Sequence, residues 1–381
     1  MDKKTFIDSA MIGDIAAGAA FLGTGGGGDP YIGGLLCREA LDRFGPVELM
    51  PLSALDDDAA VFIAAGVGAP TVDLEKLMSL DQYDCAVRVL ERRVGRKATA
   101  IIAAEIGGEN ATAPIAYAAM RGLPLVDADG MGRAFPSLQM STFSLAGISC
   151  APVALADEFG NTVMVESQSA EVAEKLVRPV VTAMGASAAI SCYAMTGAQA
   201  KSAAIPGTIS VARTIGEAIG HDTASNKAPV ARLIDALESV LLYRRARQVF
   251  RGKIVALSRD TTGGFVFGRC EIESPDRQSH AVIQFQNENL VIEIDGAVAV
   301  IVPDLITIVD FDTARAIPTE ALRYGQRVAV IACCAPPQLC TPAALAVMGP
   351  AAFGLTHPYR PFDDSPSTTS KGERNELPTI G

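Results

Sequence analysis

The order of the apolar segments limits the possible folds of this chain more than any other feature of its sequence. Apolar runs of strand length occupy residues 61–65, 99–104 and 123–126, and segments with helical apolar spacing occupy residues 10–21, 30–44, 81–94 and 111–121. Strands that alternate with helices are typical of a sheet covered by helices on both faces. The first half of the chain therefore predicts an α/β domain with a parallel or mixed sheet.

The pattern of apolar residues changes after about residue 150. Two short apolar runs, 151–156 and 162–166, flank a Gly-Asn turn and predict a β-hairpin. Helices are expected at 169–184, 208–219 and 228–249, and the last of these has a basic end. The runs that follow are strand-like, at 253–258, 264–273, 280–286, 290–294, 297–302, 305–309 and 327–334. They predict a smaller β-rich C-terminal domain, built as a sandwich or barrel.

These changes in pattern give the expected domain boundaries. Residues 1–167 form the α/β domain with a glycine-rich loop, residues 168–250 are a helical continuation packed on it, residues 251–360 form the β-rich domain, and residues 361–381 form a mobile tail. The tail is rich in Pro, Ser, Thr and charged residues, so it has little apolar surface to bury. Two domains also suit a length of 381 residues, because a domain usually has roughly 150.

Charge and composition disfavour several classes of partner. The chain has 32 basic and 43 acidic residues and a formal net charge of −11, so we expect neither nucleic acid nor an anionic membrane as a partner. Asp8 and Asp14 interrupt the apolar stretch near the N-terminus, which does not resemble a secretory signal. The eight cysteines contain no CxxC pair. We expect a cytoplasmic protein with reduced thiols, and the acidic, alanine-rich composition favours a soluble homo-oligomer.

A run of four glycines is the strongest local signal. Gly25, Gly26, Gly27 and Gly28 precede Asp29, which can cap a helix that begins at Pro30. Glycine backbone can approach a ligand closely, and N–H groups before a helix can hold an anion or a developing oxyanion. The loop matches neither a Walker A motif nor a dinucleotide fingerprint. We predict that residues 25–29 contact the substrate; the alternative is a tight turn packed against other backbone.

A second cluster follows the strand predicted at 99–104. Glu105 comes directly after that strand, Gly108 completes a Gly-Gly bend, and Glu109 and Asn110 follow it. Ligands of open α/β sheets bind beyond the carboxyl ends of the strands. We therefore predict a catalytic role for Glu105 and substrate contacts for Gly108, Glu109 and Asn110.

A third cluster follows the strand predicted at 123–126. Asp127 and Asp129 are separated by one residue, so their carboxylates can converge and supply one acid and one base. Arg133 could keep one of them ionised or clamp a substrate carbonyl. We predict catalytic roles for all three residues; the alternative is that the aspartates cap helices or form turns.

No cofactor is indicated with certainty. His221, His280 and His357 are the only histidines and lie far apart in the sequence. A divalent metal held by the predicted carboxylates together with His357 is one possibility.

Several of these motifs resemble a known bacterial family. The segments 22–31 (LGTGGGGDPY), 105–110 (EIGGEN) and 124–136 (PLVDADGMGRAFP) are similar to a family formerly of unknown function and since named for S-methyl thiohydantoin desulfurase. Segments 286–290, 303–306 and 349–354 resemble its second domain. The resemblance covers roughly residues 8 to 357. Similar domains also occur fused to hydantoinase- or oxoprolinase-like modules.

The resemblance implies an enzyme that hydrolyses a cyclic thioimidate, releases methanethiol and leaves a hydantoin. The sequence therefore predicts a hydrolase of small five-membered nitrogen heterocycles. Two alternatives remain open at this point. One is a hydantoinase-type hydrolase of cyclic amides, and the other is a non-catalytic regulatory subunit that binds phosphate or a nucleotide through the glycine loop.

Overall fold

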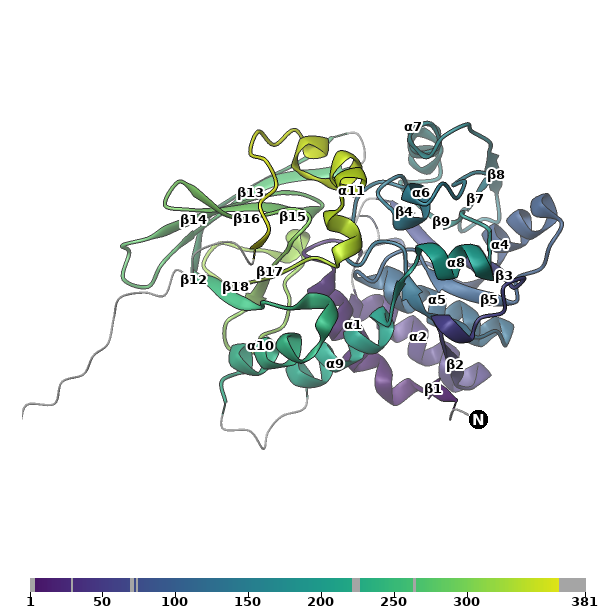
Figure 1. Ribbon diagram of the computed structural model, residues 1–381, viewed down its shortest axis with the longest axis horizontal. Helices are drawn as coiled ribbons and strands as arrows, with labels where there is room; N and C mark the ends of the chain where they lie inside the picture. The colour runs from purple at the N-terminus through teal and green to yellow at the C-terminus, as the bar shows by residue number, and fades with distance from the viewer. Residues whose placement is uncertain are drawn as a thin grey trace, which may run out of the picture.

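The computed structural model describes residues 4–28, 30–68, 72, 75–220, 227–262 and 265–362. It consists of an α/β part built on a mixed sheet and a C-terminal part built on a curled antiparallel sheet, which lie on opposite sides of Figure 1. Asp29, His221 and residues 363–381, which include nearly all of the expected mobile tail, lie outside the described residues. Within the described ranges, no helix combines the length and the apolar character needed to cross a membrane.

Four parallel strands form the centre of the first sheet, in the order β2 (Val47–Pro51), β6 (Leu125–Asp129), β5 (Ala100–Ala103) and β3 (Ala60–Ile63). Three short antiparallel strands complete it: β1 (Thr5–Ile7) beside β2, β10 (Met195–Thr196) beside β3, and β11 (Ile205–Pro206) beside β6. The prediction of a mixed sheet is therefore confirmed.

Both faces of this sheet are buried, which explains why its strands are continuous apolar runs. Along β3, Val61 and Ile63 belong to one hydrophobic core, whereas Phe62 between them belongs to another. Alternate residues of a strand point to opposite faces, so each face has its own core. The helices of the α/β part are α1 (Ile12–Leu22), α2 (Pro30–Phe44), α4 (Leu80–Val94), α5 (Glu109–Arg121), α6 (Thr142–Leu145), α7 (Ala170–Ala183), α8 (Gly197–Ala203) and α9 (Thr208–Gly220).

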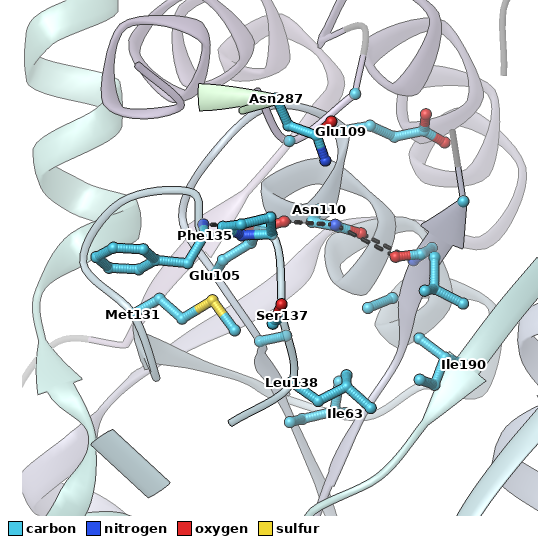
Figure 2. A pocket seen from close by; sticks show the side chains of 18 of the residues that line it. Ile63, Glu105, Glu109, Asn110, Met131, Phe135, Ser137, Leu138, Ile190 and Asn287 are labelled. Carbon is cyan, nitrogen blue, oxygen red and sulfur yellow. Dashed lines mark hydrogen bonds between the residues drawn. The ribbon is translucent and has the colours of Figure 1, made fainter. Parts of the chain in front are cut away.

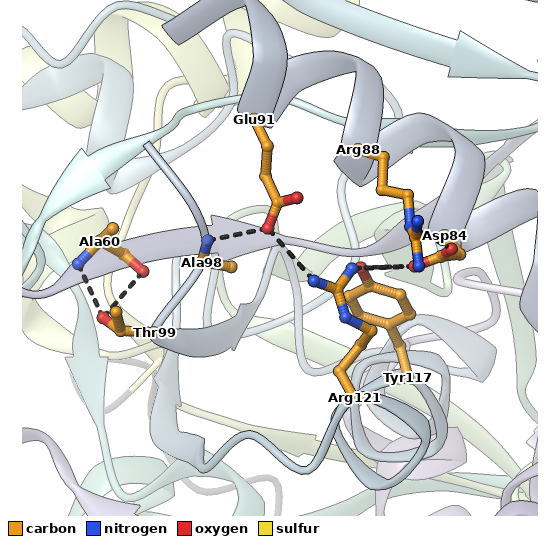
Figure 3. Close-up of polar contacts among 8 residues, drawn as sticks. All are labelled: Ala60, Asp84, Arg88, Glu91, Ala98, Thr99, Tyr117 and Arg121. Carbon is orange, nitrogen blue, oxygen red and sulfur yellow. Dashed lines mark hydrogen bonds and ion pairs between the residues drawn. The ribbon is translucent and has the colours of Figure 1, made fainter. Parts of the chain in front are cut away.

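A polar network fixes α4 against α5 (Figure 3). Arg121 on α5 contacts Asp84 at 2.8 Å and Glu91 at 3.5 Å, both on α4. It also donates a hydrogen bond of 2.7 Å to the hydroxyl of Tyr117 one turn earlier. Glu91 in turn accepts the backbone N–H of Ala98, just before β5. The network therefore sets the position of the helix α5 whose first turn carries Glu109 and Asn110.

A second, four-stranded sheet covers part of the first. Its order is β4 (Ala65–Gly68), β9 (Ser187–Ser191), β7 (Val153–Ala156) and β8 (Thr162–Val165), all antiparallel. The β7–β8 hairpin is as predicted. The run predicted as one strand at 61–65 instead divides at Ala64, because the chain leaves the first sheet and continues as β4 in the second. Strand β9 was not predicted from the sequence.

The C-terminal part contains one curled antiparallel sheet in the order β16-β15-β14-β13-β12-β18-β17. Its strands are β12 (Arg247–Thr262), β13 (Phe265–Glu273), β14 (His280–Gln286), β15 (Glu288–Ile294), β16 (Ala297–Ile301), β17 (Leu305–Asp310) and β18 (Arg327–Cys333), with helix α11 (Pro342–Met348) after them. The prediction of a β-rich block is confirmed. The helix predicted at 228–249 is wrong in its second half: α10 (Pro229–Ser239) is shorter, and residues from Arg247 onward pair with β18.

Helices α1 and α9 cross with their backbones in contact. A Cβ atom added to Gly18 on α1 would lie 1.7 Å from the carbonyl oxygen of Ala212 on α9. A Cβ added to Gly216 on α9 would lie 1.8 Å from the carbonyl oxygen of Asp14 on α1. Only glycine allows this approach, so these two glycines fix the distance between the helices.

We predict that Gly18→Ala lowers the free energy of unfolding by at least about 1–3 kcal/mol, because the backbone of α9 must move away from the new methyl group. Gly34→Ala on α2 is the matched control. A Cβ there would make ordinary contacts at 3.6 and 3.7 Å, and alanine favours the helix by up to about 1 kcal/mol. Urea unfolding measures both effects; equal stability of the two variants would contradict the tight crossing.

Candidate functional site

A pocket of about 110 Å³ lies beyond the carboxyl ends of β3 and β5, where the sequence predicted a site. Its wall combines the first sheet, the second sheet, the glycine loop and the C-terminal part. The lining residues include Gly27, Gly28, Ile63, Gly66, Glu105, Glu109, Asn110, Met131, Phe135, Arg178, Ile190, Asn287 and Glu288. Figure 2 shows Glu105 and Asn110 on one side of this pocket and Ile63, Leu138 and Ile190 on another. One side is therefore polar and the other is apolar.

Glu105 is the predicted catalytic residue that the structure places in the pocket. Its side chain is held at both oxygens: Oε1 accepts a 2.7 Å hydrogen bond from the amide of Asn110, and Oε2 accepts one of 3.2 Å from the N–H of Phe135. Only 6% of Glu105 is exposed. Burial raises the pKa of its carboxyl to about 7, although these two hydrogen bonds favour the ionised form.

Asn110 connects Glu105 to the second sheet. Its side-chain oxygen accepts a 2.8 Å hydrogen bond from the N–H of Gly66 on β4, while its nitrogen donates to Glu105 (Figure 2). These bonds fix which way the amide points, so the Asn110 amide can only donate to the carboxylate. The predicted place of Asn110 in the site is consistent with this geometry.

Asp129 lies behind Glu105 and does not line the pocket. The side chain is fully buried, and Oδ2 accepts hydrogen bonds from the N–H groups of Met131 at 2.9 Å and Gly132 at 2.7 Å. Burial raises the pKa of Asp129 to about 7. Its charge also contributes to the raised pKa of Glu105, after burial, which is the main cause. Asp129 therefore acts on the pocket through Glu105 rather than on a ligand.

The structure does not bring Asp127 to the pocket, which corrects the prediction of a converging pair. Oδ1 of Asp127 accepts hydrogen bonds from the N–H groups of Ile209 and Ser210, at 3.0 and 3.1 Å, in the first turn of α9. The carboxylate therefore caps this helix. The alternation of side chains along β6 places both aspartates on one face, but α9 covers the position of Asp127.

The prediction that Arg133 clamps a substrate is also wrong. Its guanidinium is fully buried, and its five N–H groups have five acceptors: the carbonyl oxygens of Ala134, Asn289, Pro303 and Asp304 and the hydroxyl of Thr24. No donor remains for a ligand. Burial lowers the pKa of Arg133 to about 10, and nearby carboxylates oppose that shift. Arg133 instead fastens the C-terminal part to the glycine loop.

The four glycines of the loop differ in what they contact. Gly25 and Gly26 do not line the pocket and instead pack against the C-terminal part. A Cβ on Gly25 would lie 2.7 Å from Thr319, and one on Gly26 would lie 2.1 Å from Glu288. Gly27 and Gly28 do line the pocket. The prediction of substrate contact is therefore consistent with the geometry for Gly27 and Gly28 only, and Asp29 lies outside the described residues.

Gly108 and Glu109 differ in the same way. Gly108 has a left-handed φ of 57°, and a Cβ on it would lie 2.3 Å from the carbonyl oxygen of Gly27. It supports the glycine loop and does not line the pocket. Glu109 lines the pocket, is half-buried and accepts a 3.4 Å hydrogen bond from the hydroxyl of Tyr83.

Two charged pocket residues were not predicted as site residues, one on α7 and one on β15. Arg178 on α7 donates a 2.6 Å hydrogen bond to the carbonyl oxygen of Pro136, pairs with Glu174 and stacks 4.6 Å from the ring centre of Phe265. Glu288, at the start of β15, is buried in the pocket wall. The segment that contains Glu288 was noted only for its family resemblance, and nothing in the sequence of α7 marks Arg178.

The described residues contain no group of three or more His, Cys, Asp or Glu arranged to hold a metal ion. His357 is exposed and is not among the residues that line the pocket. The pocket carboxylates and His357 are therefore not brought together, which corrects the one metal site that the sequence suggested.

Comparisons with known proteins agree on the family and the fold. A family model described as "S-Me-THD-like, N-terminal domain" matches residues 10–167, and one described as "S-Me-THD-like, C-terminal domain" matches residues 168–362. No curated protein matches the sequence. The crystal structure of a protein from Chromobacterium violaceum, a structural genomics target, resembles this one with a TM-score of 0.78 and 24% identity, over 94% of this chain and 99% of that one. This likeness shows a shared fold.

The buried carboxyls predict how stability depends on pH. Folding raises the pKa of Glu105 from 4.5 and that of Asp129 from 3.8 to about 7, so the folded protein binds these protons more tightly than the unfolded chain. Their contribution is therefore full below about pH 4 and is lost as the pH rises through 7. Because one pKa unit is worth about 1.4 kcal/mol, the raised pKa of Asp129 alone lowers the free energy of unfolding by about 4 kcal/mol between pH 4 and pH 8.

We predict that the free energy of unfolding falls between pH 5 and 8, and that Asp129→Asn makes this fall smaller. Urea unfolding at several pH values measures the effect. Asp127→Asn is the matched control, and its pH dependence should follow that of the wild type. Parallel curves for the wild type and Asp129→Asn would contradict the raised pKa of Asp129.

Proposed function

The chain belongs to the S-Me-THD-like family, and we propose that it is a hydrolase of small five-membered nitrogen heterocycles. The proposed substrate is a cyclic thioimidate, in which a ring carbon carries a methylthio group and a double bond to nitrogen. Water replaces the methylthio group, so that the products are a hydantoin and methanethiol. The observation that carries the proposal is Glu105, a buried carboxyl with a pKa of about 7 in the wall of a small pocket.

The size and lining of the pocket support a small heterocycle. An apolar cavity of ~150 Å³ accepts a benzene ring, and the pocket here has about 110 Å³. Ile63 and Ile190 offer an apolar surface for one part of the ligand, while Glu105 and Asn110 face another part (Figure 2). A compact ring with polar atoms on one side matches this division.

The charge of the lining favours this proposal over a phosphate- or nucleotide-binding subunit. Three carboxyl groups line the pocket, those of Glu105, Glu109 and Glu288, and Arg178 is the one basic side chain among the described lining residues. Its guanidinium already pairs with Glu174. A phosphate carries negative charge, so a lining rich in carboxylates would repel it.

Glu105 is suited to act as the general base. With a pKa of about 7 it is partly ionised at neutral pH and can still hold a proton that it accepts. It removes a proton from a water molecule as that water adds to the ring carbon that carries sulfur. The hydrogen bonds from Asn110 and Phe135 keep the carboxylate oriented during this step. The same arrangement would suit hydrolysis of a cyclic amide, whose product is a carbamoyl amino acid.

We predict that the purified protein releases methanethiol from an S-methyl thiohydantoin and that Glu105→Gln slows this at least about a hundredfold, since the general base is lost. Thiol detection and chromatography of the ring product measure the reaction. The matched control is Asp127→Asn, which changes a helix cap away from the pocket and should keep the wild-type rate. A carbamoyl amino acid product without methanethiol would identify a hydantoinase. Full activity of Glu105→Gln would refute the role of Glu105 as the general base.

The rate should also depend on pH through Glu105. The base is active when it is ionised, so kcat/KM should rise about tenfold per pH unit below pH 7 and level off above it. Initial rates between pH 5 and 9 test this. A rate that stays constant across pH 5 to 7 would show that no group with the pKa of Glu105 controls the reaction.

A further inference from the structure

Glu288 reaches the pocket from the C-terminal part of the molecule. It is the first residue of β15, and its carboxyl rests on the α-carbon of Gly26 so closely that an added Cβ would lie 2.1 Å from Oε1. The preceding residue, Asn287, has a left-handed φ of 57°, and its side-chain oxygen accepts a 2.8 Å hydrogen bond from the N–H of Val266. The hydrogen-bonded turn at Asn287 therefore holds Glu288 in the pocket wall, against the glycine loop.

The second oxygen of this carboxyl has no protein partner. Oε2 of Glu288 is buried and makes no hydrogen bond to any described residue. An ionised carboxylate without donors is costly to bury, whereas a protonated carboxyl carries an O–H group that can donate to a ligand. Burial, and after it the charge of Glu105, raises the pKa of Glu288 well above its usual range. At neutral pH the pocket therefore holds one carboxyl that accepts protons and one that can donate.

Given the proposed function, we propose that Glu288 is the catalytic acid that protonates the ring nitrogen when water adds. The proton balance closes with two carboxyls. Glu105 takes one proton from water while Glu288 gives its proton to the nitrogen, and the C=N bond becomes C–N. The carbon–sulfur bond then breaks, the departing thiolate takes the proton from Glu105, and Glu288 regains the proton of the new hydroxyl as the ring carbonyl forms. Both groups return to their starting states.

The other pocket carboxyl is less suited to this role. Glu109 is half-buried, and its Oε1 accepts the hydroxyl of Tyr83 at 3.4 Å. This carboxyl already accepts a hydrogen bond, and it is less buried than Glu288. Asp129 is buried but does not line the pocket. Glu288 is thus the described carboxyl that both faces the pocket and has an unpartnered oxygen.

The test compares two substrates and two variants. An S-methyl thiohydantoin alkylated on both ring nitrogens carries a permanent positive charge and needs no proton from the protein. With the neutral substrate we expect Glu288→Gln to be at least about a hundredfold slower than the wild type. With the alkylated substrate, after subtraction of the uncatalysed rate, we expect the rate of Glu288→Gln to lie within about fivefold of the wild-type rate. Glu105→Gln should remain slow on both substrates.

Glu293→Gln is the matched control, because Glu293 lies on the same strand and does not line the pocket. It should keep wild-type rates on both substrates. Thermal unfolding of each variant shows whether it is folded. Infrared difference spectra of wild type minus Glu288→Gln provide a second measurement that does not require turnover, since a protonated Glu288 gives a carboxylic acid C=O band at pH 7.

The outcomes separate the two proposals. Equal slowing of Glu288→Gln on both substrates, or a wild-type rate on the neutral one, would overturn the role of Glu288 while the proposed function stands. Absence of the carboxylic acid band would also overturn it, whether or not turnover occurs. A wild-type protein that releases no methanethiol from either substrate would overturn the proposed function, and with it the acid step.

Discussion

The buried guanidinium of Arg133 is the contact on which the site depends. Four of its five N–H groups join the loop after β6 to distant segments: one donates to Thr24 beside the glycine run, and three donate to carbonyls of the C-terminal part. One of those carbonyls belongs to Asn289, next to Glu288. The same contact therefore closes the molecule and carries Glu288 to Gly26. The pocket has carboxyls from both parts of the molecule because Arg133 holds these parts together through buried hydrogen bonds.

Burial of carboxyl groups is the second constraint, and it follows from the first. Once the C-terminal part covers the strand ends, Glu105, Asp129 and Glu288 lose most of their contact with water. Each then has a raised pKa, chiefly from burial. Differences in hydrogen bonding distinguish them, because Glu105 has two donors and Oε2 of Glu288 has none among the described residues. Similar side chains can thus take opposite roles in proton transfer.

The sequence predicted the parts of the fold and site that depend on local pattern. Apolar strands that alternate with helices identified the mixed sheet, and strand ends identified Glu105. The predictions that were wrong concern residues whose structure depends on contacts between distant segments. Asp127 matched the expected pattern, but the first turn of α9, about 80 residues later, takes its carboxylate. Likewise the segment after Ser239 carries a helix-like pattern, yet pairing with β18 makes its continuation a strand.

A crystal structure with the product hydantoin would show whether Glu105 and Glu288 act on the same ring. We expect the ring in the pocket between Ile190 and the glycine loop, with the carbon that lost sulfur beside Glu105 and a ring nitrogen within hydrogen-bond distance of Glu288. Hydantoin bound elsewhere, or bound with that carbon turned away from Glu105, would contradict it.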